Sequence, residues 1–168
     1  VYPVYGRPAD LIELNLKDFD PDLPNMRLVG RVSGQKMLPY YTREEIEKAP
    51  FAAPVLLWGD SAVDIHIMQI QGSAVAKLDD GSSVRIGYAD NNGRRFRGIG
   101  SILLAKGLLK PGKADMISIK KWLNDNPAEA QKLMRENERY IFHRIIEGKG
   151  PVGAFGVPLT AGRSLAVD

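Results

Sequence analysis

The stretch VDIHIMQIQGSAVAKLDDGSSVRIGYADNNGRRFRGIGSILLAKG, from Val63 to Gly107, holds the densest run of polar and glycine-punctuated positions in the chain. Its pattern predicts strand, turn, strand, turn and helix. Along alternate positions from Val63 to Ser73 one strand face changes from apolar to polar, as a strand would on leaving a packed core for a groove. The opposite face changes the other way, which indicates that the strand crosses a barrel wall or twists strongly at Gly72.

Turn and cap signals outside this strand predict the other elements. Thr42 and Glu45 form a capping box, so a short helix is expected over 43–49, stopped by Pro50. Helical spacing before Gly107 predicts a short helix from Ile99. A hairpin is predicted over 77–83, a buried strand over 53–58, further strands over 27–33, 139–146 and 157–168, and a strand or two within 1–16. A loop is predicted over 18–25, a turn over 34–39, and helices starting after Asp115 and at Pro127.

Length and composition bound the class of protein. The 168 residues predict one domain, or one domain with a small annex, and 44% hydrophobic residues are enough for a core. The net charge of +3 is a weak signal for an acidic polymer as partner. Since there is no Cys and only two His, disulfides are excluded and the spacing of metal ligands is missing, so no metal is expected. No run of membrane-spanning length and no signal peptide is present.

The sequence at both ends of the chain indicates that it is part of a longer protein. It opens at Val1 without an initiator Met, and it stops in SLAVD, a strand-like pattern cut short. We therefore expect 1–168 to be an excised segment of a longer protein.

Several catalytic patterns are weak in this sequence. GRRFRGIG, over 93–100, lacks the strand–helix frame and the Lys-Ser/Thr ending of a phosphate loop. Ser73 has no nucleophile elbow around it, which favours a hydrogen-bonding serine. Asp60, Asp64 and Asp90 would have to face one another in pairs to cleave a glycoside, and none lies in a motif that distinguishes it from a surface Asp.

A set of amides, hydroxyls and rings is the better candidate for a site. Neutral amides and hydroxyls match sugar hydroxyl and N-acetyl groups as donors and as acceptors, and Tyr rings cover apolar sugar faces. The alternative, that the amides only satisfy strand ends and turns, stays open. The set comprises Gln69, Gln71, Ser73, Tyr88, Asn91 and Asn92.

Five stretches of the sequence match those of a known protein family and occur in the same order. They are LPYYTREEIE at 38–47, MQIQGSA at 68–74, the positions Gly87, Tyr88, Asn92, Gly93, Arg94, Ile99 and Gly100, SIKKWL with Asn126-Pro127, and GPVGAFGVPLTAGRSLAVD at 150–168. Together they resemble the MltA family of lytic murein transglycosylases over essentially the whole chain. Ala74 stands where the family has Gly after QGS, and Phe96 where Tyr is usual.

The resemblance implies an α+β fold, mainly β: an antiparallel β-barrel-like inserted domain with short helices, plus parts of a flanking double-psi β-barrel. In the family the glycan lies in the groove between these two units. The single catalytic Asp of the family belongs to the barrel segment that follows SLAVD. No catalytic residue is therefore expected within 1–168, and Asp168 does not take that place.

The resemblance also implies an activity for the parent protein. It is cleavage of the β-1,4 bond between N-acetylmuramic acid and N-acetylglucosamine to give 1,6-anhydromuropeptides, without a cofactor. The implied partner is the peptidoglycan glycan strand, and the parent is expected to be a monomeric lipoprotein at the periplasmic side of the outer membrane. Glycan positioning is assigned to Gln69, Gln71 and Ser73 on the strand, Tyr88 and Asn92 after it, and Tyr40 and Tyr41 beside it.

Two other readings remain open. One is a non-catalytic module for glycan or nucleic acid, with Arg94, Arg95 and Arg97 around Phe96; steep loss of binding with salt would favour nucleic acid. Nucleic acid is not the expected partner. The other is a self-sufficient glycosidase that uses Asp64 and Asp90, which predicts activity in the isolated chain.

Overall fold

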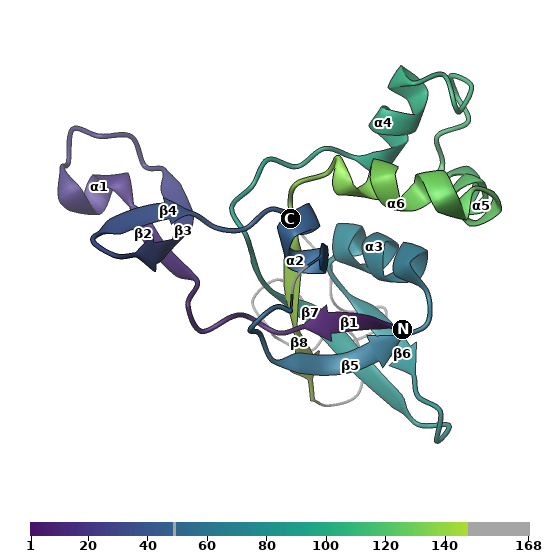
Figure 1. Ribbon diagram of the computed structural model, residues 1–168, viewed down its shortest axis with the longest axis horizontal. Coiled ribbons are helices and arrows are strands. Elements are labelled where there is room, and N and C mark those ends of the chain that lie inside the picture. The colour runs from purple at the N-terminus through teal and green to yellow at the C-terminus, as the bar shows by residue number, and fades with distance from the viewer. Residues whose placement is uncertain (49, 148–168) are drawn as a thin grey trace, which may run out of the picture.

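The computed structural model describes residues 1–48 and 50–147, which form small antiparallel sheets and a group of short helices (Figure 1). In chain order the described elements are β1 (Tyr2–Tyr5), β2 (Ile12–Asn15), α1 (Leu16–Phe19), β3 (Arg27–Ser33), β4 (Lys36–Pro39), α2 (Arg43–Lys48), β5 (Val55–Gly59), α3 (Ala62–Gln71), β6 (Ala74–Lys77), β7 (Ser83–Asn91), α4 (Ile99–Ala105), α5 (Met116–Asp125), α6 (Pro127–Arg135) and β8 (Ile141–Ile146).

The strands form three separate antiparallel sheets. β1 pairs with β5, β3 lies between β2 and β4, and β7 lies between β6 and β8. The predicted α+β class is confirmed. Within residues 1–48 and 50–147 no sheet closes on itself, so the barrel that the resemblance implied is not seen in this part of the chain.

The sheet β2–β3–β4, with α1 at its tip, forms an arm that extends to one side of the molecule (Figure 1). The helices α4, α5 and α6 gather at the opposite side, and α3 lies between them and the remaining strands. α3 to α6 share one core, in which Ile102, Leu103 and Leu123 have no exposed surface. A second, aromatic core contains Tyr40, Tyr140 and Phe142 and connects the base of the arm to β8.

The predicted strand from Val63 to Ser73 is wrong, because these residues form helix α3 and the turn after it. Ser61 caps the helix by accepting a hydrogen bond from the Asp64 amide at 3.1 Å, and Gly72 ends it in the left-handed region at a φ of 78°. The β-branched residues of the segment favour a strand only weakly, and burial between the other helices and the sheets overrides that preference. Because α3 is buried on several sides, its apolar residues show no clean helical period.

Several local predictions are confirmed. Residues 43–48 form α2, where the Glu45 carboxylate accepts a hydrogen bond from the Thr42 amide as a capping box requires. Asp115 caps α5, and Pro127 opens α6. β3 covers the predicted 27–33, and the turn at 79–81 joins β6 to β7 as an antiparallel hairpin.

Other predictions need correction. The predicted turn over 34–39 contains β4, which pairs with β3 after a turn in which Gly34 has a φ of 60°. The loop predicted over 18–25 begins inside α1. The strand predicted over 53–58 exists as β5, but it is not buried, since Trp58 is 61% exposed. The strand predicted over 157–168 lies outside the described residues.

Candidate glycan-binding site

The exposed part of the candidate set lies where α3 ends and β6 begins. Gln71 and Ser73 are exposed on either side of Gly72. The register of the hairpin pairs Ala74 with Ile86, so the residues just before β6 run beside Gly87 and Tyr88 on β7. Tyr88 is 45% exposed. Three of the predicted residues, Gln71, Ser73 and Tyr88, are therefore exposed in neighbouring parts of the backbone, although a helix end and a strand supply them instead of one strand face.

Tyr88 is held by one neighbour on β7 and one on β8. Its hydroxyl accepts a hydrogen bond from the Asn91 side-chain amide at 2.7 Å, and its carbonyl accepts one from Arg144 at 3.2 Å. A half-exposed ring whose hydroxyl is held in place by a hydrogen bond suits stacking against a sugar.

Gln69 is buried, in contrast to Gln71. Its Oε1 accepts a hydrogen bond from the Arg43 guanidinium at 2.6 Å. The Arg43 side chain is 3% exposed and also donates to the carbonyls of Asn137 and Arg139. Burial lowers the pKa of Arg43, although the nearby Glu47 carboxylate opposes that effect. Sequence reasoning missed this role of Arg43, since its partners lie far along the chain and no local motif marks it.

Asn92 is a second buried amide of the predicted set. Its side chain donates to the carbonyls of Tyr41 and Glu138 at 2.8 and 2.9 Å, and its Oδ1 accepts from the Tyr140 amide at 2.9 Å. These bonds join the segment after β7 to the start of α2 and to the start of β8. Asn92 thus holds these three backbone segments together, and direct contact between Asn92 and a sugar stays a prediction.

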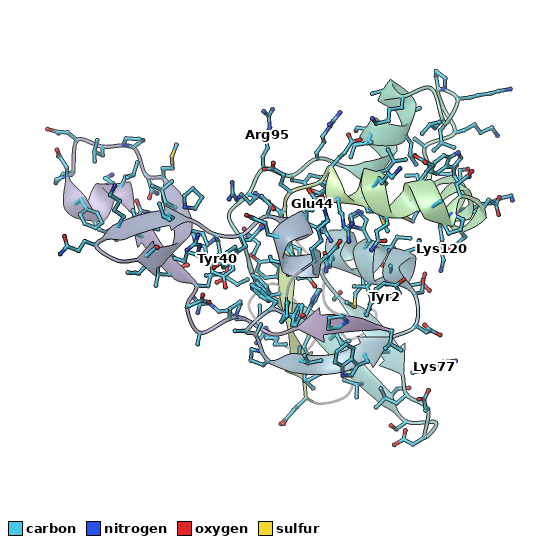
Figure 2. All side chains as sticks on the ribbon, viewed as in Figure 1. Tyr2, Tyr40, Glu44, Lys77, Arg95 and Lys120 are labelled. Carbon is cyan, nitrogen blue, oxygen red and sulfur yellow. The ribbon has the colours of Figure 1, made fainter. Side chains whose placement is uncertain are left out.

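The two tyrosines of the predicted set differ in exposure. Tyr40 has no exposed surface, and its hydroxyl donates to the Asp10 carboxylate at 2.6 Å; Figure 2 labels Tyr40 at the base of the arm. Burial raises the pKa of Tyr40, and the hydrogen bond to Asp10 adds to that shift. Tyr41 is partly exposed beneath the Arg31 guanidinium, which lies 4.4 Å from its ring centre. Tyr41 and Phe51 line a cavity of about 630 Å³ beside Asp10 and α2.

The carboxylates considered for a self-sufficient glycosidase lie in unrelated places. Asp64 is exposed on α3 and pairs with Lys120 at 2.6 Å. Asp90, on β7, accepts hydrogen bonds from Arg7 and Arg27, each at 2.8 Å. Burial alone would raise the pKa of Asp90, but these two guanidinium groups outweigh it and hold the pKa below its usual value. Asp90 therefore stays ionised, which suits an anchor for the arm and does not suit a proton donor.

The two histidines are buried and neutral. Burial lowers the pKa of His66 to about 3, with a contribution from Arg43, and that of His143 to about 4. Among residues 1–48 and 50–147, neither ring has a hydrogen-bond partner for its nitrogens. Over the same residues, no group of three or more His, Asp or Glu side chains is arranged to hold a metal ion.

The basic segment after β7 is partly engaged in the fold. Arg94 donates to the Tyr40 carbonyl at 2.8 Å, and Arg97 pairs with Glu136 at 3.0 Å. Arg95 is exposed and points outward from the loop (Figure 2). Because two of the three cations hold internal partners, the segment offers less charge to a polyanion than the sequence alone suggested.

The fold is an α+β domain that exposes amide, hydroxyl and ring groups at the end of α3 and on β7. The family model that matches is that of MltA, described as the MltA specific insert domain, over residues 1–144. The chain belongs to the MltA family, as the resemblance in its sequence predicted.

Relatives and solved structures agree with this assignment. The chain is 32% identical over 116 residues to the membrane-bound lytic murein transglycosylase A of Escherichia coli K12, covering 68% of this chain and 32% of that protein. The Vibrio cholerae protein of the same name is 29% identical over 131 residues, covering 76% and 36%.

The structure of MltA from Neisseria gonorrhoeae superposes with a TM-score of 0.81 at 30% identity, covering 95% of this chain and 48% of that one. A membrane-bound lytic murein transglycosylase from Agrobacterium tumefaciens gives a TM-score of 0.82 at 32% identity, covering 96% and 46%. The chain thus spans about a third of the length of the curated relatives and just under half of the solved chains. Within the described residues, no helix is long and apolar enough to cross a membrane.

Proposed function

We propose that this chain is the glycan-positioning part of a lytic transglycosylase that cleaves the MurNAc–GlcNAc β-1,4 bond of peptidoglycan. The observation that carries the proposal is membership of the MltA family, and the exposure of Gln71, Ser73 and Tyr88 supports it. The relatives bear the name murein transglycosylase, which supports glycan strands as the substrate.

In this proposal the exposed and the buried members of the predicted set have different roles. Gln71, Ser73 and Tyr88 contact the sugar, and the partly exposed Tyr41 offers a further ring beside α2. The Gln amide and Ser hydroxyl pair with N-acetyl and hydroxyl groups, while the Tyr88 ring covers a sugar face. Gln69, Asn92 and Tyr40 act beneath this surface by fixing the helix end, the loop and the base of the arm.

The chemistry is assigned to a carboxyl group of the parent outside this chain, on a flanking double-psi β-barrel. That group donates its proton to the glycosidic oxygen as the bond between that oxygen and the muramic C1 breaks. The muramic C6 hydroxyl then bonds to C1 and returns its proton to the carboxylate, which leaves a 1,6-anhydro end. Water is not consumed, and one carboxyl group serves in turn as acid and as base. The isolated chain is accordingly expected to be inactive.

The parent is proposed to work as a monomer, anchored as a lipoprotein at the periplasmic side of the outer membrane. The phrase "membrane-bound" in the names of the relatives supports a membrane-associated location. An alternative role, as a non-catalytic binding module, predicts binding without cleavage even in the full-length parent.

Digestion of purified sacculi tests the proposal. The full-length parent should release muropeptides that are lighter by one water than the hydrolysed products, as mass spectrometry of the soluble fraction would reveal. The segment 1–168, shown by circular dichroism to be folded, should release none. Hydrolysed reducing ends from the parent, or anhydro products from the segment alone, would contradict the assignment.

A further inference from the structure

The loop that joins α4 to α5 contains two lysines that have no counter-charge. Lys110, Pro111, Gly112 and Lys113 form a tight turn, in which the Lys113 amide donates to the Lys110 carbonyl at 3.0 Å and Gly112 has a φ of 80°. Such a turn holds the Cα atoms of its first and last residues within about 7 Å of each other. Both lysines are exposed, and within residues 1–48 and 50–147 neither has an ion-pair partner. The turn therefore concentrates positive charge that these parts of the fold do not neutralise.

Neighbouring lysines of the helical group are paired within the fold. Lys106 pairs with Glu136 at 2.9 Å. Lys120, which Figure 2 labels on the side of α5 that faces α3, pairs with Asp64 at 2.6 Å. The two lysines of the turn thus differ from their neighbours in being available to a partner.

Exposed apolar side chains lie close to this turn. Leu108, two residues before Lys110, is 39% exposed, and Ile117, in the first turn of α5, is 83% exposed. Leu108, Lys110, Lys113 and Lys121 line one hollow of about 340 Å³. Ile117 lies one helical turn before Lys121, on the same face of α5. We call Leu108, Lys110, Lys113, Ile117 and Lys121 the basic tip.

The position of the basic tip leaves it open to a large partner. The α4–α5 loop lies at the outer edge of the helical group, and the arm extends from the other side of the molecule (Figure 1). Exposed apolar side chains surrounded by charged ones are typical of surfaces that contact a protein or a membrane.

The combination of charge and apolar surface restricts the partner. Unpaired lysines favour an anionic one. A nucleic acid would bind the lysines through its phosphates, but it offers no apolar phase to Ile117. A stable protein interface buries about 800 Å² on each side, whereas the exposed apolar groups here are few and stand among lysines, Gly107 and Pro111. A bilayer with anionic lipids suits both features, because its headgroups attract lysines and its acyl boundary accepts single apolar side chains.

We propose that the basic tip contacts the surface of a bilayer that contains anionic phospholipids. Lys110 and Lys113 lie at the level of the lipid phosphates, and Leu108 and Ile117 enter the acyl boundary. The contact is weak and reversible, because only a few side chains make it. It goes beyond the proposed function and does not depend on glycan binding or cleavage.

Co-sedimentation with vesicles tests the proposal on the full-length parent, prepared without a lipid anchor. The parent should sediment with vesicles made of equal parts of phosphatidylcholine and phosphatidylglycerol, and much less with phosphatidylcholine vesicles. The bound fraction should fall as salt is added, because salt screens the attraction between lysines and headgroups. Absence of binding to the mixed vesicles, or equal binding to both kinds, would overturn the proposal.

Variants at the tip and on the arm locate the contact. Lys110→Gln combined with Lys113→Gln should weaken binding to the mixed vesicles by about fivefold for each lysine removed. Ile117→Ser should weaken it about tenfold, because the side chain no longer gains from leaving water. Lys17→Gln combined with Lys36→Gln removes the same charge from exposed positions of the arm and should leave binding unchanged.

Val32→Ser is the matched control for Ile117→Ser, because Val32 is 63% exposed on the arm. If the arm variants weakened binding as much as the tip variants, the attraction would be one of overall charge and the proposed contact would be wrong. If Ile117→Ser bound like the parent, no apolar side chain would enter the bilayer, which would also overturn the proposal. Vesicle binding is measured without sacculi, so a failure of the proposed glycan cleavage would leave this result unaffected.

Discussion

Arg43 on α2 donates a hydrogen bond of 2.6 Å to Oε1 of Gln69 on α3, so a buried cation fixes the helix turn that precedes Gln71 and Ser73. The same guanidinium holds the carbonyls of Asn137 and Arg139, at the approach to β8. One side chain therefore connects three segments that are remote in sequence. Arg43 therefore supports the residues that are proposed to contact glycan, but it is not one of them.

Arg43→Leu should destabilise the protein strongly. The change leaves Gln69 and two backbone carbonyls without their donor inside the core, and we expect the free energy of unfolding to fall by about 3 kcal/mol. Urea denaturation followed by circular dichroism measures it. The exposed Arg95→Leu is the control, with an expected change within about 0.5 kcal/mol. If the free energy of unfolding fell by a similar amount in both variants, the buried hydrogen bonds of Arg43 would not be stabilising the core.

The two buried histidines should make the protein sensitive to mild acid. Both have a folded pKa below the unfolded value, at about 3 for His66 and about 4 for His143, so protons bind preferentially to the unfolded chain. The stability is then complete above about pH 6.5 and falls as the pH drops toward 4, by about 1.4 kcal/mol per pH unit for each histidine.

Denaturation curves at several pH values, for the parent and for His66→Phe, check this expectation. The variant should lose about half of the slope between pH 6 and pH 4.5. His143→Phe should behave in the same way. A slope that neither substitution changes would mean that other groups titrate in this range.

Short-range signals predicted several elements of this fold correctly. The cap at Asp115, the Pro127 start and the Thr42–Glu45 box each act within one helical turn, so the sequence contains all of their chemistry. The helix at 62–71 was missed because its environment decides its state. Its β-branched residues favour a strand, whereas packing against the surrounding helices and sheets favours the helix. The sequence pattern does not reveal where those neighbours lie.

For the candidate site, too, the sequence predicted some features and not others. Gln71, Ser73 and Tyr88 are exposed, although the predicted strand face was wrong, and their contact with glycan stays a prediction. The burial of Gln69 and Asn92 was not predictable, because their partners are contributed by residues 26 to 51 positions away. No local pattern distinguishes an amide that binds a ligand from one that holds a loop.

Asp90→Asn should loosen the arm in a pH-dependent way. The Asp90 carboxylate links Arg7, before β2, and Arg27 on β3 to β7. Its folded pKa is depressed, so this stabilisation is complete above the unfolded value of about 3.9 and is lost as the pH falls through the folded pKa.

Hydrogen exchange of the β2–β3–β4 amides measures the effect. At neutral pH the arm of Asp90→Asn should exchange faster than that of the parent, while α5 remains unchanged. Glu13→Gln is the control, because it alters a more exposed partner of Arg27 and leaves Asp90 in place. Equal exchange in the arms of Asp90→Asn and the parent would exclude Asp90 as an anchor.

Gln71→Ala should impair turnover of glycan without impairing the fold. Gln71 is exposed at the end of α3, next to Gly72, whose positive φ and missing side chain leave space for a sugar ring. Its amide can donate to and accept from an N-acetyl group and a ring hydroxyl at once. Its loss should lower kcat/KM of the full-length parent on sacculi by a factor that corresponds to about 1 to 3 kcal/mol, with an unchanged Tm.

The matched control for that experiment is Gln69→Ala, two residues earlier on the same helix. Gln69 is buried against Arg43, so its loss should lower the Tm first and reduce turnover only as far as folded protein is lost. Measuring Tm and kcat/KM on both variants separates a residue that contacts the substrate from one that supports the fold. If Gln71→Ala is as active as the parent while remaining fully folded, the helix end does not contact the glycan, and the proposed surface would have to centre on Tyr88 instead.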